Sequence, residues 1–391
     1  MEANWHYRAF TPEEHRTRLE RAQRLMQKND LAASVCTSPE LIYYFCGYEA
    51  HTHHAIGSQA LILPADGHDP TLILRDGDAP QADESLVLGS MQLFRLGAID
   101  LAALIASCIA DMGLERETIG LDMSGPVMNA ALTDQVRAVL SQCTFRDCWR
   151  LLGKLRTVLS EQEIRYLEEA AGYADIGIDT FYDKARVGMS EIELAAEIEY
   201  AMRSAGSDYF AVPTWMASGE RAHCQHAMAS PRKVAPGDLV HAEFSGVARR
   251  YQCVTMGSLT LGEPNARTRQ MAQGGADAFF AGLAAARVGG RIGDMELAYR
   301  EALAAQGLSD CCPMRFGVGI SAAYPPVWEN QITIQFECDD LLELGMAFYI
   351  HSSMQSMEDK NGMLLGGSFL MTSTGPKRLD KAPIELVVVD A

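Results

Sequence analysis

The spacing of apolar residues changes along the chain, and this change separates expected helices from expected strands. Apolar residues three and four positions apart, preceded by capping residues, are typical of amphipathic helices. On this basis helices are expected at 11–28, 101–112, 160–185, 190–206, 266–285 and 294–306. Short apolar runs between turn residues predict strands. They lie at 31–36, 60–64, 71–74, 118–121, 239–244, 251–258, 332–336, 346–351, 368–372 and 384–389.

The order of these elements predicts two domains. Strands and helices alternate up to about residue 150, which is the pattern of a small α/β domain. Longer helices and longer strands follow. The expected fold class is therefore α+β, with a first domain at 1–152 and a second at 153–391.

A single acidic residue stands inside the apolar strand 239–244. Gly246 is expected to start a hairpin after this strand. Glu243 must be paired, hydrogen-bonded or protonated, because burying a bare carboxylate is too costly. One interpretation is a salt bridge to Arg249 or Arg250, and the other is an acid held at the floor of a pocket.

Three histidines lie near this acid in the sequence. His223 and His226 belong to the segment 220–229, which a flanking glycine and proline mark as a loop. We expect His226 to act as an acid or base, because imidazole titrates near neutral pH; the alternative is a hydrogen-bonded structural histidine. His241 lies two residues before Glu243, so both side chains point to one face of the sheet. There His241 is either a titrating neighbour of the acid or a buried packing residue.

Residues 317–329 are rich in glycine, proline and aromatic residues. Such a segment predicts a stiff loop that lines a pocket or, alternatively, a packed surface loop. Tyr324 and Trp328 are candidates for clamping a small planar cation between their ring faces. Glu358, further along, either binds the same cation or is solvated.

Several of these segments resemble the creatinase/prolidase/methionine-aminopeptidase family. The strand GDLVHAEFSG at 237–246, the turn FGVGI at 316–320 and the strand GMAFYI at 345–350 carry the resemblance, and SPELIYYFCGY at 38–48 resembles the family's N-terminal domain. The resemblance covers nearly the whole chain. It implies that the second domain has the pita-bread fold, a curved antiparallel sheet with helices on its outside.

Metal-binding members of this family hold two divalent ions with two aspartates, one histidine and two glutamates. By resemblance these positions fall on Glu243, Val254, Val318, His351 and Gly366. Three of them have no side-chain donor atom, whereas a transition metal needs about three N, O or S ligands. We therefore expect no metal and no other cofactor, and we expect His351 to replace metal charge with a titratable proton.

The metal-free members creatinase and ectoine hydrolase resemble the chain more closely. The similar features are the acid-bearing strand with its turn up to Tyr251, the YPPVW motif at 324–328 and the position of His226. The resemblance implies a hydrolase that opens an amidine-like C–N bond of a small, possibly cyclic, solute. Glu243 would attack the carbon or activate water, and His226 would move the proton to the departing nitrogen. The expected substrate-binding residues are Tyr324, Trp328, His351, Tyr251, His241 and Glu358.

Composition excludes some partners and sets the expected compartment. The net charge of −18 argues against a nucleic-acid surface, which needs clustered Lys and Arg. No apolar run reaches the roughly 18 residues of a membrane span. The first ten residues lack a signal pattern, so a cytoplasmic location is expected. The ten cysteines are scattered without a CxxC pair, which indicates reduced, mostly buried thiols.

Two other functions stay open at this stage. A peptidase- or lyase-type metalloenzyme is conceivable if His223, His226, His241, Glu243 and His351 form a rearranged mononuclear site, and so is a binding protein descended from the enzymes. The resemblance further implies a homodimer with pockets at the subunit boundary. In it His51, His53 or His54 would reach the partner's pocket, although the residue pattern alone favours a polar surface loop.

Overall fold

The computed structural model describes residues 8–49, 59–95, 97 and 100–390, so the loop that carries His51, His53 and His54 lies outside the described residues. The chain divides into two compact units, Met1–Arg156 and Thr157–Ala391. The division falls four residues beyond the predicted boundary at 152.

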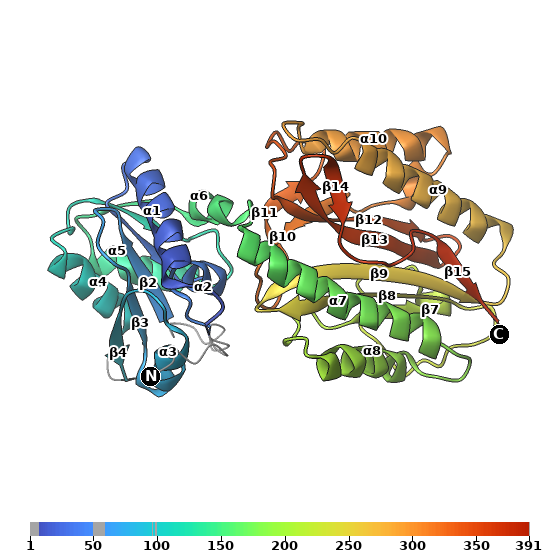
Figure 1. Ribbon diagram of the computed structural model, residues 1–391, viewed down its shortest axis with the longest axis horizontal. Coiled ribbons are helices and arrows are strands. Elements are labelled where there is room, and N and C mark those ends of the chain that lie inside the picture. The colour runs from blue at the N-terminus through green and yellow to red at the C-terminus, as the bar shows by residue number, and fades with distance from the viewer. Residues whose placement is uncertain (1–7, 50–58, 96, 98–99, 391) are drawn as a thin grey trace. The chain divides into compact units, whose positions relative to one another are not determined.

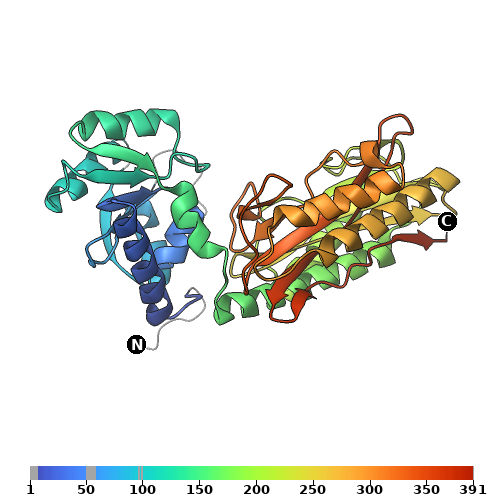
Figure 2. The same ribbon diagram turned by 90° about the horizontal axis from the view of Figure 1, so that it is seen from above.

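The first unit is a mixed sheet with helices on both faces. Its strand order is β4-β3-β2-β1-β5-β6. The strands are β1 (Ala33–Cys36), β2 (Gln59–Pro64), β3 (Thr71–Arg75), β4 (Ser90–Phe94), β5 (Thr118–Leu121) and β6 (Thr144–Asp147). The helices are α1 (Pro12–Lys28), α2 (Pro39–Cys46), α3 (Ala79–Ser85), α4 (Leu101–Asp111), α5 (Ala130–Val139) and α6 (Trp149–Gly153). One core lies under α1 and α2 and the other under α4 and α5 (Figure 2). The edge strands β4 and β6 are mostly exposed, which explains why no apolar run predicted them.

The second unit contains a larger, mainly antiparallel sheet. Its strand order is β11-β10-β12-β13-β9-β8-β7, with β14 paired to β13 and β15 paired to β9. The strands are β7 (Trp215–Ser218), β8 (Leu239–Ala248), β9 (Tyr251–Leu261), β10 (Gly317–Ile320), β11 (Glu329–Ile334), β12 (Ala347–Ser356), β13 (Asn361–Thr372), β14 (Gly375–Arg378) and β15 (Leu386–Val389). The helices are α7 (Glu161–Lys184), α8 (Glu191–Ala205), α9 (Ala266–Ala284) and α10 (Gly293–Ala305).

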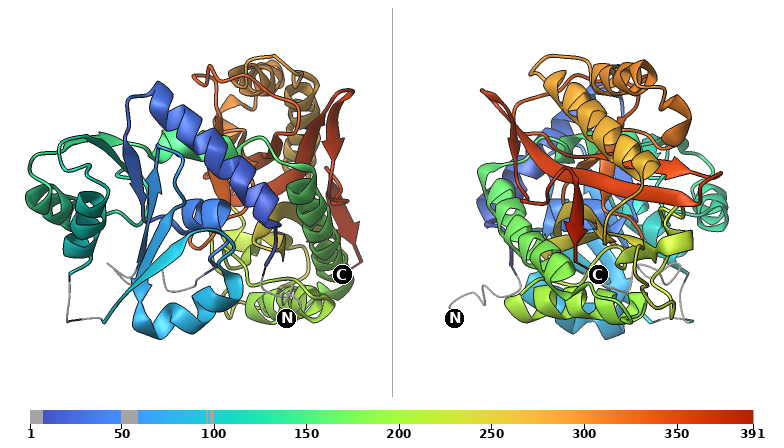
Figure 3. Two further views of the ribbon diagram at one scale, coloured as in Figure 1. Left: turned by 60° about the vertical axis from the view of Figure 1, so that its left-hand side comes forward. Right: turned by 90° about the vertical axis from the view of Figure 1, so that its right-hand side faces the viewer.

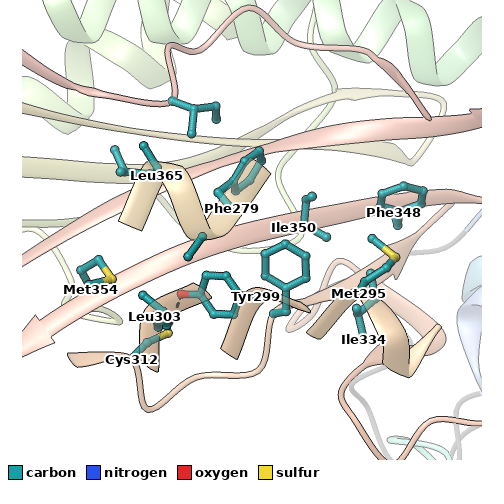
Figure 4. Close-up of a cluster of buried hydrophobic side chains, with 14 of the residues drawn as sticks. Phe279, Met295, Tyr299, Leu303, Cys312, Ile334, Phe348, Ile350, Met354 and Leu365 are labelled. Atoms are coloured by element: carbon teal, nitrogen blue, oxygen red, sulfur yellow. Dashed lines mark hydrogen bonds between the residues drawn. The ribbon is translucent and has the colours of Figure 1, made fainter. Parts of the chain in front are cut away.

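All four helices of this unit lie on the outer face of the curved sheet (Figures 1 and 3). Helices α7 and α8 pack on β8 and β9, and α9 and α10 pack on β12 and β13. Figure 4 shows the second contact, where Phe279 and Tyr299 meet Phe348 and Ile350. Even-numbered residues of β8 and β12 therefore face the helices, and odd-numbered residues face inward.

The hairpin of β8 and β9 differs from the expected one in its turn. Strand β8 continues through Gly246 to Ala248, and the turn consists of Arg249 and Arg250, whose φ angles of 48° and 70° suit a two-residue hairpin. Gly246 instead allows close packing, because a Cβ there would collide with the backbone of α7 at Ala170 and Ala174.

In the part of the chain that the structure describes, no helix combines the length and apolar character that crossing a bilayer requires.

Candidate active site

One row of paired residues crosses the inner face of the second unit. Glu243 on β8 pairs with Met256 on β9, Met256 with Gly366 on β13, and Gly366 with His351 on β12. Trp215 on β7 pairs with Glu243 and extends the row at its other end. Paired residues share a face of a sheet, so the sheet brings together side chains that are far apart in sequence.

A cavity of about 190 Å³ lies on this row. It is smaller than the roughly 300–1,000 Å³ typical of drug-sized ligands, which favours a small solute. Its wall is Val212, Trp215, His226, Glu243, Met314, Arg315, Val318, Pro326, Val327, Trp328, Glu329, Tyr349 and His351. The structure thus places four of the expected site residues, Glu243, His226, Trp328 and His351, around one space.

Glu243 is 5% exposed and carries a strongly shifted carboxyl group. Burial raises its pKa to about 8, and the hydrogen bond that Tyr349 Oη donates to its Oε1 at 2.9 Å opposes the rise. The carboxyl is therefore mainly protonated at neutral pH. Arg250 does not pair with it, because the guanidinium donates instead to the carbonyl oxygens of Tyr209 and Ala323.

His226 is a neutral base at neutral pH. Its ring packs on Trp215 with 4.4 Å between ring centroids. Burial lowers the pKa of His226 from 6.5, and the positive charge of Arg315 lowers it further. The cavity thus contains a protonated acid and a neutral base, which is the pairing that general acid–base catalysis needs.

His351 does not supply the positive charge that the sequence predicted. Its Nδ1 shares a 2.9 Å hydrogen bond with Ser353 Oγ. Burial lowers the pKa of His351 to about 3, and the charges of Arg315 and His226 act in the same direction. The imidazole is therefore neutral, and the expectation of a titratable proton replacing metal charge is corrected.

Trp215, Arg315 and Tyr349 are among the wall residues that were not singled out from the sequence. Trp215 meets Trp328 edge to face at 5.1 Å between ring centroids, and Arg315 forms an ion pair with Glu329. Tyr349 was detectable from strand parity, because it lies two positions before His351 and faces the same side. Trp215 and Arg315 stand where strands meet loops, and no sequence period marks such positions.

The structure places the other four expected substrate-binding residues away from the cavity wall. Tyr324 is fully buried, with the Arg250 guanidinium 5.0 Å from its ring centre. Tyr251 donates a 2.6 Å hydrogen bond to Glu163 Oε1. His241 is fully buried, and its Nε2 lies 2.9 Å from the carbonyl oxygen of Ala222. Glu358 is exposed in the turn between β12 and β13.

The residues at the family's metal positions do not fit a two-metal centre. Val254, Val318 and Gly366 bring no donor atom to the inner face. A Cβ on Gly366 would lie 2.9 Å from both Met256 Sδ and His351 Cβ, so this part of the row is filled by other side chains. No cluster of three or more His, Cys, Asp or Glu side chains suited to a metal occurs within 8–49, 59–95, 97 and 100–390. Of the five residues expected in a mononuclear site, His226, Glu243 and His351 line the cavity, but in the described part of the chain they do not form a cluster that could hold a metal ion.

Both units of the chain match families of known proteins. Residues 165–373 match the model described as metallopeptidase family M24, and residues 18–158 match the creatinase/prolidase N-terminal domain. The Xaa-Pro dipeptidase of Pyrococcus furiosus is 23% identical over 370 residues, which cover 95% of this chain and 99% of that protein. The ectoine hydrolase of Halomonas elongata is 24% identical over 399 residues, with 97% and 98% covered. The solved dipeptidase of Pyrococcus horikoshii has a TM-score of 0.85 at 22% identity, with 95% and 100% covered.

Proposed function

The chain belongs to metallopeptidase family M24, with the family's N-terminal domain and its pita-bread fold, and from this premise we propose that it opens an amidine-like C–N bond without a metal. The family membership and the fold agree with the expectation from sequence. It is a hydrolase of this family, and the bond and the absence of metal are the proposed part. One observation carries the proposal: a carboxyl group whose pKa is raised by burial and an imidazole whose pKa is lowered by burial line the same small aromatic cavity.

The pKa shifts exchange the first roles that the sequence suggested for the two groups: His226 acts first as the base and Glu243 first as the acid. In the addition step the neutral imidazole of His226 takes a proton from water, the water oxygen bonds to the amidine carbon, and Glu243 gives its proton to the substrate nitrogen. In the second step the imidazolium of His226 protonates the departing nitrogen while the carboxylate of Glu243 takes the proton of the new hydroxyl group. The C–N bond breaks, a carbonyl forms, and both groups return to their starting state.

The wall of the cavity suits a small planar solute. Trp215 and Trp328 offer ring faces and edges, and Tyr349 orients the acid from the sheet. Among the described residues that line the cavity, Arg315 is the one with a permanent positive charge. Arg315 and its ion-pair partner Glu329 are each about one-third exposed. An exposed ion pair of this kind contributes only ~0–1 kcal/mol, so an anionic group of the solute can replace Glu329 at low cost.

The experiment compares amidines with peptides under control of metal. Purified protein is dialysed against a chelator, its metal content is measured, and it is incubated with ectoine, creatine, related amidines and Xaa-Pro dipeptides, with products followed by mass spectrometry. Turnover of an amidine in metal-depleted protein is expected, with losses of about 10²- to 10⁴-fold in Glu243→Gln and His226→Gln. Dipeptide cleavage that depends on about one transition metal per chain would overturn the proposal in favour of a peptidase. Binding without chemical change of any of these compounds would indicate a non-catalytic descendant.

The homodimer also belongs to this proposal, because by resemblance the pocket lies at a subunit boundary. Light scattering at micromolar concentration tests it, and a mass equal to one chain of 42.7 kDa would contradict it.

A further inference from the structure

The residues that hold His226 in place form a second cluster, outside the cavity wall. His226 belongs to the loop 219–230, which runs between β7 and the segment before β8. Such a loop loses orientation easily unless its ends are tied, because its regular structure is limited to one short 3-10 turn at Gly219–Arg221. The described contacts show where this loop is tied.

Glu191, the first residue of α8, binds both ends of the loop through one carboxyl group. Ser218 Oγ, at the start, donates to its Oε1 at 2.7 Å, and Arg221 also pairs with Oε2. Ser230, at the end, donates to Oε2 from its backbone nitrogen at 2.9 Å and from Oγ at 2.6 Å. Glu191 is completely buried, and these donors satisfy both of its carboxyl oxygens there.

Arg221 joins the two ends a second time. Its Nη1 donates to Ser230 Oγ at 2.8 Å and its Nη2 to the carbonyl oxygen of Met228 at 3.0 Å. Between these ties, the backbone nitrogen of Met216 donates to the Ala227 carbonyl oxygen at 2.8 Å, next to His226. These hydrogen bonds connect the start of the loop to its end, and the imidazole of His226 packs against Trp215.

We propose that Glu191 is a positioning residue for His226, because it fixes both ends of the loop 219–230 to the first turn of α8. The catalytic part of this inference rests on the proposed function, whereas the positioning of the imidazole does not. Glu191 lies outside the cavity wall and acts through the loop alone.

The chain offers a matched control on the same helix turn. Glu193 stands two residues after Glu191 and closes the capping box of α8 with Ser190. Its hydrogen bonds go to Ser190, and among the described residues none goes to the loop. Both carboxylates stand in the first turn of α8, but of the two only the Glu191 side chain hydrogen-bonds to the loop ends.

The test measures the imidazole directly and then the reaction. In Glu191→Ala and in the milder Arg221→Gln, hydrogen exchange within 219–230 is expected to accelerate. The NMR titration of His226, assigned by its loss in His226→Gln, is expected to move up toward 6.5 as the ring leaves Trp215 and Arg315. Glu193→Ala is expected to leave both measurements at the wild-type values. Glu191→Gln keeps the shape and is expected to restore most of the wild-type titration.

Unchanged exchange and titration in both Glu191→Ala and Arg221→Gln would overturn the proposal, as would an equal effect of Glu193→Ala. With an active substrate, kcat is expected to fall about tenfold or more in Glu191→Ala while KM changes little, because a misplaced base slows the chemical step. A shifted titration in protein that turns over no amidine would retain the positioning role and refute the proposed function instead.

Discussion

Tyr349 Oη donates a 2.9 Å hydrogen bond to Glu243 Oε1 on the inner face of the sheet, and this hydrogen bond orients the buried carboxyl group. With one oxygen occupied as an acceptor, the carboxyl proton is carried by the other oxygen. The ring of Tyr349 and the carboxyl both line the cavity, so the acid is held in one orientation beside the space where a substrate binds.

Tyr349→Phe tests this contact. The hydrogen bond lowers the pKa of Glu243, so its loss is expected to raise that pKa further above about 8. The stability cost is expected to be ~0.5–1.5 kcal/mol, the usual net value of one hydrogen bond. Infrared difference spectroscopy across pH, with Glu243→Gln to assign the carboxyl band, gives the titration. A carboxyl band that titrates at lower pH in Tyr349→Phe than in the wild type would contradict the contact.

The raised pKa of Glu243 also predicts how stability depends on pH. Between about 4.5 and about 8 the folded protein keeps this proton while the unfolded chain has lost it. The contribution is fully present below pH 4.5 and is lost as pH rises through 8, with a slope of up to about 1.4 kcal/mol per pH unit.

Comparison with Glu243→Gln isolates this contribution, because Gln has no proton to lose. Buried His351, with its pKa near 3, acts in the opposite sense and only below pH 6.5, so the window from 6.5 to 8 is the cleanest. Urea unfolding at several pH values measures the difference. Parallel stability curves for the two proteins across this window would show that Glu243 titrates normally.

We expect the positive charge of Arg315 to set part of the pKa shift of His226. Its charge lowers the pKa of His226, so Arg315→Gln should raise that pKa and move the acid limb of any rate profile to higher pH. Glu329→Gln is the matched control, because it leaves the charge of Arg315 unpaired and should not raise the pKa of His226. NMR titration of His226 in both variants checks the sign. Equal upward shifts in the two variants would rule out the charge of Arg315 as the cause.

Gly246 is expected to be irreplaceable for steric reasons. A Cβ in Gly246→Ala would meet the α7 backbone at Ala170 and Ala174, and relief requires α7 to move, at a cost of about 1–3 kcal/mol. Gly172→Ala, on the same helix with open space around it, should instead stabilise the protein by roughly 0.5–1 kcal/mol. Thermal unfolding measures both. Similar melting temperatures for Gly246→Ala and the wild type would mean that the helix yields easily.

Local pattern alone determined most of the fold and part of the site. Capping residues and periodicity located α1, α7 and α8, because caps and amphipathic faces depend on near neighbours. Strand parity likewise placed His241 and Glu243 on one face. Strand parity does not show how far along a strand a cavity extends. His241 was therefore expected in the site, whereas its imidazole hydrogen-bonds to the carbonyl oxygen of Ala222.

Only the tertiary structure decided which groups meet and which protons they carry. Glu243 and His351 lie on strands more than a hundred residues apart, and the register through Met256 and Gly366 brings them into one row. Loops add His226 and Arg315 to the cavity wall beside that row. Burial raises the pKa of Glu243 and lowers that of His226, so the acid and the base are both neutral. A pKa depends on everything that surrounds a group, and no stretch of sequence contains that surrounding.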